Sequence, residues 1–273
     1  MLNSQFNGGR MHDGGILTLL TDFGYRDVYV GVMKGAIAQI NPQVTVVDLT
    51  HDIPPQDVVA GRFCLMNAVP YFPEGTVHVA VVDPGVGSQR RAIAVQLANA
   101  VFVAPDNGLL TAVLTEETAI AAAVELTNPQ YWRTSTPSTT FHGRDIFAPV
   151  GAHIARGVPL AKLGNPIDPR ILVKLDFPQW EPTSEGARGC IQYVDRFGNL
   201  ATNIPGTAVR EQRWSVVAAG TKIPGGTTYS DATQGGAIAL VGSHGWVEIA
   251  VNGGSARSQL QLEVGATVEV RWQ

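Results

Sequence analysis

Apolar runs and stretches of helical periodicity alternate along the first half of the chain. Residues 16–20 form a short apolar run that predicts a buried strand, and residues 28–40 carry apolar or small side chains at helical spacing up to Asn41-Pro42. The same reasoning predicts strands at residues 44–49, 76–82, 92–97 and 101–104, and helices at residues 57–69 and after Asn107-Gly108. This alternation indicates an α/β fold with a mostly parallel sheet that helices cover on both faces.

The pattern changes after about Pro166, where short apolar segments are separated by turns rich in Gly, Pro, Asn and Ser. Such a pattern is typical of a smaller all-β domain, either a barrel or a sandwich. Its apolar segments are residues 189–194, 215–219, 237–241, 247–251 and 267–272. We therefore predict a flexible tail at residues 1–15, an α/β domain at residues 16–170 and a β-barrel domain at residues 180–273. A cleft between two such domains is the usual place for a ligand.

Composition narrows the possible functions. The 273 residues carry a formal net charge of -4 and contain no run of Lys and Arg, which disfavours a nucleic-acid partner. No apolar run reaches the ~18 residues expected of a membrane span, and the first fifteen residues lack the apolar centre of a signal peptide. The HExxH, P-loop and GxGxxG patterns are absent, so we expect no metal and no phosphate-containing cofactor. We expect a cytoplasmic globular protein without a membrane partner.

Acidic residues follow each of the first three predicted strands: Asp22 in TDFG, Asp48 to Asp52, and Asp83 in DPGVG. Ligands of open α/β sheets bind beyond the carboxyl ends of the strands. Asp22 could bind a ligand or simply cap a helix. Arg90 follows Asp83 by seven residues across a tight turn and can fold back onto its carboxylate. That pair could serve the chemistry or form a structural salt bridge.

Two further loops carry candidate chemistry. His142 lies in FHGRD before a predicted helix, and a histidine with a reference pKa of ~6.5 can exchange a proton at working pH. An ordinary loop histidine would look the same. In the second domain, Asp195 and Asn199 flank an aromatic-Gly turn. They could bind an amine and the edge of a heterocycle with Phe197 stacking on it, or they could form only a tight hairpin turn.

The order and spacing of the motifs are more specific than any one of them. In order along the chain they are TDFG, DLTHDIPP, VDPGVGSQRR, PDNGLL, FHGRD, DRFGNLATNI and SHGWVEIAVNGG. This series closely resembles the S-adenosylmethionine hydroxide adenosyltransferases, which are related to fluorinating and chlorinating enzymes acting on the same substrate. The resemblance implies hydrolysis of S-adenosyl-L-methionine to adenosine and L-methionine by in-line attack of an activated water on the ribose 5′-carbon. It also implies a homotrimer with substrate between neighbouring subunits, and neither a metal nor a cofactor.

The resemblance also implies roles for single residues. Asp83, Arg90 and His142 match the water-activating triad, and Asp22 matches the carboxylate that holds the ribose hydroxyls. The remaining substrate-binding positions are Asp195 and Ser243 at the methionine end, Asn199 at the adenine edge with the backbone from Val251 to Gly253, Phe197 and Phe141 as aromatic lining, and Glu248 facing the adenine or the amine. His244 replaces an Arg of the halogenases, which leaves open what holds the methionine carboxylate.

Alternative functions remain at this point. A halide-using enzyme is disfavoured because His142 and Gly143 stand where halogenases place a Tyr and a Ser. A nucleoside hydrolase would need an Asp-rich calcium motif, of which only Asp22 and Asp27 are present. A non-catalytic sensor of adenosine or S-adenosylmethionine would not need the intact triad. Whether His142 or Asp83 is the base is not decided by the sequence.

Overall fold

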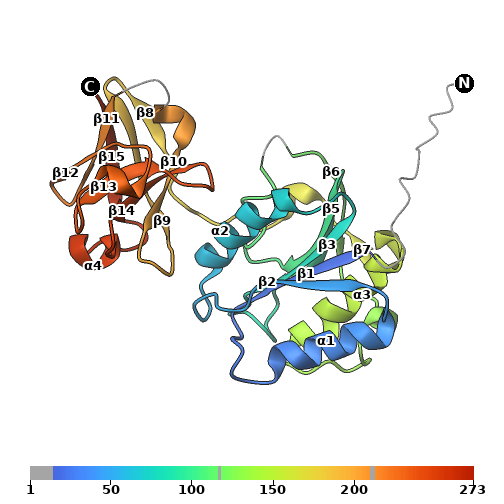
Figure 1. Ribbon diagram of the computed structural model, residues 1–273. Helices are drawn as coiled ribbons and strands as arrows, with labels where there is room; N and C mark the ends of the chain where they lie inside the picture. Colours follow the sequence, from blue (N-terminus) through green and yellow to red (C-terminus); the bar gives the residue numbers. More distant parts are fainter. Residues whose placement is uncertain (1–14, 116–117, 210–212) are drawn as a thin grey trace, which may run out of the picture. The chain divides into compact units, whose positions relative to one another are not determined.

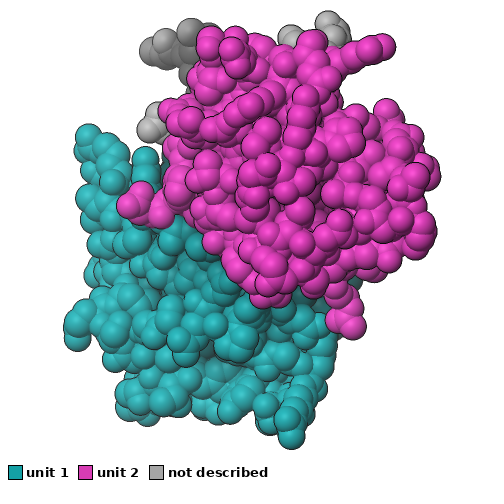
Figure 2. Space-filling model, turned by 90° about the vertical axis from the view of Figure 1, so that its left-hand side faces the viewer, with its two compact units in different colours: residues 1–175 teal, residues 176–273 magenta. Residues whose placement is uncertain are grey.

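The computed structural model describes residues 15–115, 118–209 and 213–273. The chain divides into two compact units, residues 1–175 and residues 176–273 (Figure 2). Apart from Gly15, the tail predicted at residues 1–15 lies outside the described residues. None of the described helices is both long enough and apolar enough to span a membrane.

Unit 1 (residues 1–175) contains a seven-stranded sheet flanked by helices (Figure 1). The strand order is β2 (Thr45–Thr50), β1 (Ile16–Thr21), β3 (Thr76–Val81), β5 (Ala100–Pro105), β4 (Ala92–Leu97), β6 (Ile120–Glu125) and β7 (Asn165–Pro166). The first four pair in parallel, whereas β4, β6 and β7 pair antiparallel. The predicted α/β class is confirmed, with a sheet that is mixed because β4 returns directly beside β5.

Three helices cover the sheet: α1 (Tyr29–Ile40) and α3 (Ala148–Ala155) on one face and α2 (Val58–Ala68) on the other (Figure 1). The helix predicted after Asn107-Gly108 is wrong. Residues 107–114 form successive turns instead, with Gly108 at a φ of 93°, and Leu109 and Leu110 are both buried. Two consecutive buried leucines in a turn produce an apolar run that sequence periodicity does not distinguish from a helix.

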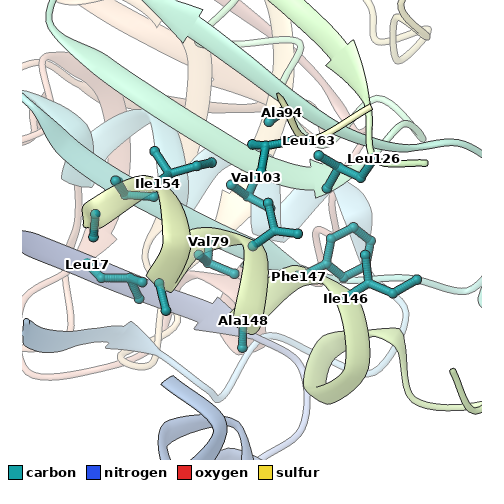
Figure 3. Packing of buried hydrophobic residues seen from close by; sticks show 14 of the residues in the cluster. Leu17, Val79, Ala94, Val103, Leu126, Ile146, Phe147, Ala148, Ile154 and Leu163 are labelled. Carbon is teal, nitrogen blue, oxygen red and sulfur yellow. The ribbon is translucent and has the colours of Figure 1, made fainter. Parts of the chain in front are cut away.

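The core of unit 1 forms because successive side chains along each strand point to opposite faces of the sheet. Leu17, Val79 and Val103 belong to the buried cluster that α3 covers (Figure 3). Successive strand residues point to opposite faces, so the neighbouring positions face α2. A Cβ on Gly151 of α3 would lie 2.5 Å from Val79 Cγ2, so this helix packs closely on the sheet only because that residue has no side chain.

A buried histidine lies on β3. His78 is 1% exposed, its Nδ1 lies 2.8 Å from Thr18 Oγ1, and its ring stacks on Phe102 with centroids 5.1 Å apart. Burial lowers the pKa of His78 to about 4, because the charged imidazolium is poorly solvated there. The histidine is therefore neutral in the folded protein at physiological pH.

This burial predicts a pH dependence of stability. Between pH 6.5 and about 4 the unfolded chain binds a proton at His78 and the folded chain does not, so the free energy of unfolding falls as the pH falls through that window. From pH 6.5 to 5 the expected loss is about 2 kcal/mol, at ~1.4 kcal/mol per pH unit. Urea unfolding at pH 6.5 and at pH 5 measures the free energy of unfolding. Between these two pH values the wild type should lose more of it than His78→Gln does. Equal losses in the two proteins would contradict the prediction.

Unit 2 (residues 176–273) is an eight-stranded antiparallel sheet that nearly closes into a barrel. Its path is β12 (Thr221–Pro224), β11 (Trp214–Ala218), β15 (Thr267–Trp272), β9 (Gly186–Val194), β10 (Leu200–Pro205), β14 (Trp246–Val251) and β13 (Ala237–Val241), and β8 (Glu181–Thr183) pairs with β9. The Gly226 N–H donates to Ala239 O at 2.8 Å and so links the two ends of this path. A short helix, α4 (Ala256–Leu260), follows β14. The predicted barrel-like class is confirmed, and all five predicted segments lie on strands; β8, β10 and β12 were not predicted.

Candidate active site

Asp83, Arg90 and His142 form one continuous hydrogen-bonded network in unit 1. Asp83 follows β3 by two residues, and Arg90 returns across the Gly-rich turn. Arg90 Nε donates to both carboxylate oxygens at 2.9 and 3.0 Å, and Nη2 donates to Oδ2 at 2.5 Å. Nη2 also lies 2.6 Å from His142 Nδ1. The side chains of Arg90 and Asp83 are only 10% and 4% exposed, so the pair is not an ordinary surface salt bridge.

This network determines the tautomer of His142. A guanidinium carries only donors, so the contact with Arg90 requires a lone pair on Nδ1. The proton of the neutral ring then lies on Nε2. Burial, and after it the positive charge of Arg90, lower the pKa of His142, although Asp83 and Asp145 act in the opposite direction. The network therefore holds a neutral histidine whose Nε2–H is available to a ligand.

Close backbone packing joins the two loops that supply the network. Gly87 has a φ of 77°, and a Cβ there would lie 2.3 Å from Thr139 O. A side chain at this position would both strain the turn and push the Asp83 loop away from the segment that leads to His142. Phe147 supports the network from another side, because Arg90 Cζ lies 5.2 Å from its ring centroid.

His142 immediately precedes a π-helical turn, Gly143–Phe147, which continues into α3. Such turns often occur at functional sites. Asp145 inside it is fully buried and accepts hydrogen bonds from Arg133 Nε at 2.5 Å, Arg144 Nε at 2.8 Å and the Ser138 N–H at 2.9 Å. Burial alone raises the pKa of Asp145, but the hydrogen bonds from Arg144, Arg133 and Ser138 outweigh it and hold this pKa well below its ordinary value. This clamp, which sequence reasoning did not identify, fastens the His142 loop.

Asp22 comes directly after β1 and is half-buried. Its Oδ2 accepts a hydrogen bond from the Gln56 N–H at 2.7 Å. The helix-cap interpretation of Asp22 is wrong for α1, whose N-cap is Val28 without a side-chain cap. Phe141 packs edge to face against Phe23 and Tyr29, with centroids 5.5 and 5.1 Å away.

A second group of predicted residues meets in unit 2. A pocket of about 570 Å³ there brings together four of the predicted binding residues and three others. Its lining is Phe197, Asn199, Tyr229, Val251, Asn252, Gly253 and Gly254. Phe197 is 76% exposed, which is unusual for a phenylalanine and leaves its ring face available for stacking.

Asp195 organises the turn beside this pocket. Its Oδ1 accepts from the N–H groups of Phe197 and Asn199, both at 2.8 Å, and its Oδ2 accepts from Asn199 Nδ2 at 2.9 Å. The tight-turn interpretation is therefore confirmed, and the turn also belongs to a pocket. One hydrogen of Asn199 Nδ2 is used by Asp195, so the second hydrogen can donate to a ligand and Oδ1 can accept from one. Ser243 lies exposed in the turn between β13 and β14.

Tyr229 is a pocket residue that sequence reasoning missed. It lies in a polar turn segment, TTYSDAT, in which only its aromatic ring was a signal. Its hydroxyl donates to Glu248 Oε1 at 2.9 Å, and Glu248 is 5% exposed. Burial, followed by the hydrogen bond to Glu248 and the charges of Glu248 and Asp195, raises the pKa of Tyr229 to about 12. Glu248 therefore fixes one wall of the pocket.

His244 is part of the same chain of contacts. Its Nδ1 accepts from the Trp246 N–H at 3.2 Å, and its Nε2 lies 3.1 Å from Glu248 Oε2. Both ring nitrogens are thus engaged within unit 2.

No group of three His, Cys, Asp or Glu side chains that could hold a metal ion occurs within residues 15–115, 118–209 and 213–273. The residues that come together are instead hydrogen-bond donors, carboxylates and aromatic rings. In unit 1 they form an acid–base network, and in unit 2 they line a pocket that suits a heterocycle.

Comparison with known proteins identifies the family. Residues 17–164 match the SAM hydroxide adenosyltransferase N-terminal domain (SAM is S-adenosylmethionine), and residues 189–269 match the C-terminal domain. A protein of Salinispora arenicola named (R)-S-adenosyl-L-methionine hydrolase is 42% identical over 93% of this chain and 97% of its own length. A fluorinase of Nocardia brasiliensis is 29% identical over 94% of this chain and 96% of its own length.

The fold is also similar to a solved structure, that of an uncharacterized conserved protein from Thermotoga maritima. The TM-score is 0.86 at 36% sequence identity, covering 93% of this chain and 99% of the other. Together, the two domain matches span most of both units. This chain belongs to the SAM hydroxide adenosyltransferase family, which is related to the fluorinases.

Proposed function

We propose that the protein hydrolyses (R)-S-adenosyl-L-methionine to adenosine and L-methionine. The observation that carries the proposal is the connected Asp83–Arg90–His142 network, with Arg90 between the other two. It is supported by the name and 42% identity of the Salinispora arenicola relative. The sulfonium sulfur bears three different carbon groups and is stereogenic, so a hydrolase selective for one epimer leaves the other intact.

The reaction makes one bond and breaks one bond. The water oxygen attacks the ribose 5′-carbon, the bond from this carbon to sulfur breaks, and both bonding electrons leave with methionine as a neutral thioether. The leaving group needs no acid because it carries no negative charge. Positioning a water in line with the breaking bond can contribute up to ~7–11 kcal/mol to lowering the barrier. Arg90 supplies the positive charge that stabilises the hydroxide character of the attacking oxygen.

The proton of the attacking water needs an acceptor. Within the network the available lone pairs belong to the Asp83 carboxylate and to His142 Nδ1, and Arg90 Nη2 occupies the latter. We therefore assign proton acceptance to Asp83 and assign to His142 the donation of an Nε2–H hydrogen bond toward the nucleophile. Transfer to a positioned base contributes typically ~10²–10⁴-fold to the rate.

The remaining residues would bind the adenosine and methionine parts. We assign Asp22 to the ribose hydroxyls and the rings of Phe197 and Tyr229 to the adenine faces. Asn199 Oδ1, with the backbone from Val251 to Gly253, would meet the adenine edge. Phe141, Asp195, Ser243 and Glu248 complete the assignment as aromatic lining, methionine-end contacts and support of the Tyr229 wall. The family resemblance further supports a homotrimer with its sites at subunit interfaces, and we propose a cytoplasmic location from the composition of the chain.

Halide as the nucleophile is disfavoured. A halide carries no proton and would have no use for the proton acceptor assigned to Asp83. A sensor is disfavoured for the same reason, since binding alone needs no base.

The test is incubation of the purified protein with the separated (R)- and (S)-epimers in ¹⁸O-water, with and without chloride and EDTA. We expect adenosine with one ¹⁸O at its 5′-hydroxyl from the (R)-epimer, and no effect of EDTA. Free adenine would indicate glycosidic cleavage, 5′-chloro-5′-deoxyadenosine would indicate a halogenase, and tightly bound intact substrate would indicate a sensor. Each of these outcomes contradicts the proposed hydrolysis.

A further inference from the structure

A second buried histidine, His51, lies beneath the loop that carries Asp22. It is 0% exposed, its Nδ1 is 2.8 Å from Thr21 Oγ1, and its Nε2 is 3.1 Å from Asp48 Oδ1. The backbone oxygen of His51 accepts from the Gly24 N–H at 2.8 Å. The reaction proposed above uses neither His51 nor Asp48.

The hydrogen bonds of this cluster have one consistent direction. The acceptor-only Oδ1 of Asp48 lies 3.1 Å from His51 Nε2 without the alignment of a hydrogen bond, and its negative charge favours the tautomer with the ring proton on Nε2 and a lone pair on Nδ1. The Thr21 hydroxyl then donates to Nδ1, and Thr21 Oγ1 in turn accepts from the Phe23 N–H at 3.2 Å. The two residues that bracket Asp22 are thus joined to each other and to His51.

Asp48 is anchored on its other side. Lys34 Nζ lies 2.6 Å and the Tyr25 hydroxyl 3.2 Å from Asp48 Oδ2. Burial tends to raise the pKa of Asp48, but the hydrogen bond from Lys34 and the contact with His51 outweigh it and lower this pKa, so the carboxylate stays ionised. The Tyr25 and His51 rings pack nearly at right angles, with centroids 5.1 Å apart. His51 therefore has a fixed orientation and a fixed tautomer.

The carboxylate of Asp22 itself is held by Gln56, a residue with a strained backbone conformation. Gln56 has a φ of 66°, a left-handed conformation that non-glycine residues rarely adopt, and its N–H donates to Asp22 Oδ2 at 2.7 Å. Such strain persists where the surrounding structure enforces it, and it concentrates at functional sites. Asp22 Oδ1 is then the oxygen left for a ligand.

We propose that His51, oriented by Asp48, is a positioning residue for ribose recognition, acting through Thr21 on the Asp22 carboxylate. This inference rests on the proposed function, because it takes the adenosine part of the substrate as the ligand of Asp22. If the role of His51 were purely structural, an apolar side chain could replace its buried imidazole, because buried ionisable groups are often replaceable in this way without loss of stability. The hydrogen bonds of His51 lead through Thr21 to Phe23, the two residues on either side of the half-buried Asp22.

The experiment compares binding of adenosine, 2′-deoxyadenosine and 3′-deoxyadenosine by calorimetry, using the intact protein. A hydrogen bond between a hydroxyl and a carboxylate gives the wild type an expected preference for adenosine of about 10- to 100-fold. In His51→Phe, which keeps a ring but removes both contacts, this preference should shrink by about 10-fold. A structural role would lower affinity for all three nucleosides equally, and an unchanged preference in His51→Phe would overturn the inference.

His78→Phe is the matched control. His78 is also buried and also contacts a threonine hydroxyl through Nδ1 at 2.8 Å, on the same sheet. It should lose stability and keep the preference for adenosine. If His51→Phe fails to fold, Thr21→Val removes the hydroxyl and should lose the preference, whereas Thr21→Ser should restore it. Equal preference in Thr21→Val and Thr21→Ser would overturn the inference.

The two proposals fail differently. A wild type that binds none of the nucleosides and releases no adenosine from either epimer contradicts the proposed function and the inference together. Suppose instead that the wild type hydrolyses its substrate and prefers adenosine, and that His51→Phe shows the same preference. That result contradicts only the inference.

Discussion

Asp83→Asn is expected to lower kcat by about 10²–10⁴-fold, with KM changed much less. The substitution preserves the size of the side chain but removes the proton acceptor and the negative charge that orients Arg90.

His142→Ala should likewise reduce kcat more than substrate binding, because it removes the Nε2–H that is assigned to the nucleophile. Asp22→Ala should instead impair both, since it contacts the substrate throughout the reaction. Steady-state kinetics of adenosine release measures all three variants.

Asp106→Asn is the matched control for the first variant. Asp106 is also buried and also paired with an arginine, Arg91, through contacts of 2.8 and 2.6 Å, but it lies outside the network. Its variant should lose stability and keep a kcat close to that of the wild type. An Asp83→Asn variant that turns over at the wild-type rate would contradict the role assigned to the network.

Asp145→Ala is expected to lower the free energy of unfolding by about 3 kcal/mol. Removing one partner of a buried ion pair costs about 3–5 kcal/mol. The lower end applies because Arg133 and Arg144 are 42% and 31% exposed, so water recovers part of their solvation. The expected loss of activity has a separate cause, namely release of the loop that carries His142. Urea unfolding measures the first effect, and kinetics under conditions where the variant stays folded measures the second.

Asp168→Ala provides the comparison for Asp145. Arg170 contacts both oxygens of Asp168 at 3.0 Å through Nε and one of them at 2.6 Å through Nη2. The side chains of Arg170 and Asp168 are 89% and 40% exposed, so water screens this pair and its removal should lower the free energy of unfolding much less than removal of Asp145. Similar losses for Asp145→Ala and Asp168→Ala would show that the clamp does not fasten the His142 loop.

Much of the fold was predictable because its elements leave local signals. The buried strands of unit 1 are short apolar runs, and in unit 2 the strands are short apolar segments between turn residues. The turns of residues 107–114 were not predictable, because the burial of Leu109 and Leu110 depends on contacts distant in sequence. β12 was missed for a related reason: the strand TKIP has little apolar character, and pairing with β11 stabilises it.

The candidate site divides in a similar way. Arg90 on Asp83 was predictable from seven residues of spacing and a Gly-rich turn, because the contact is local. His142 comes 52 residues after Arg90, and only its motif indicated a role. Tyr229 and Asp145 were missed, because their importance lies in what they contact. Glu248 lies 19 residues after Tyr229, and Arg133 lies 12 residues before Asp145, so no short motif shows either contact.

The amino-acid sequence by itself determined the family, the two fold classes and the residue types that carry the chemistry, since these depend on periodicity and on the order of short motifs. Only the tertiary structure decided how those residues act. It assigned the lone pair of His142 Nδ1 to Arg90, engaged both ring nitrogens of His244, and placed His51 beneath the Asp22 loop. The physical reason is that a tautomer, a burial or a hydrogen-bond direction is a property of contacts, and these contacts join residues that the sequence keeps apart.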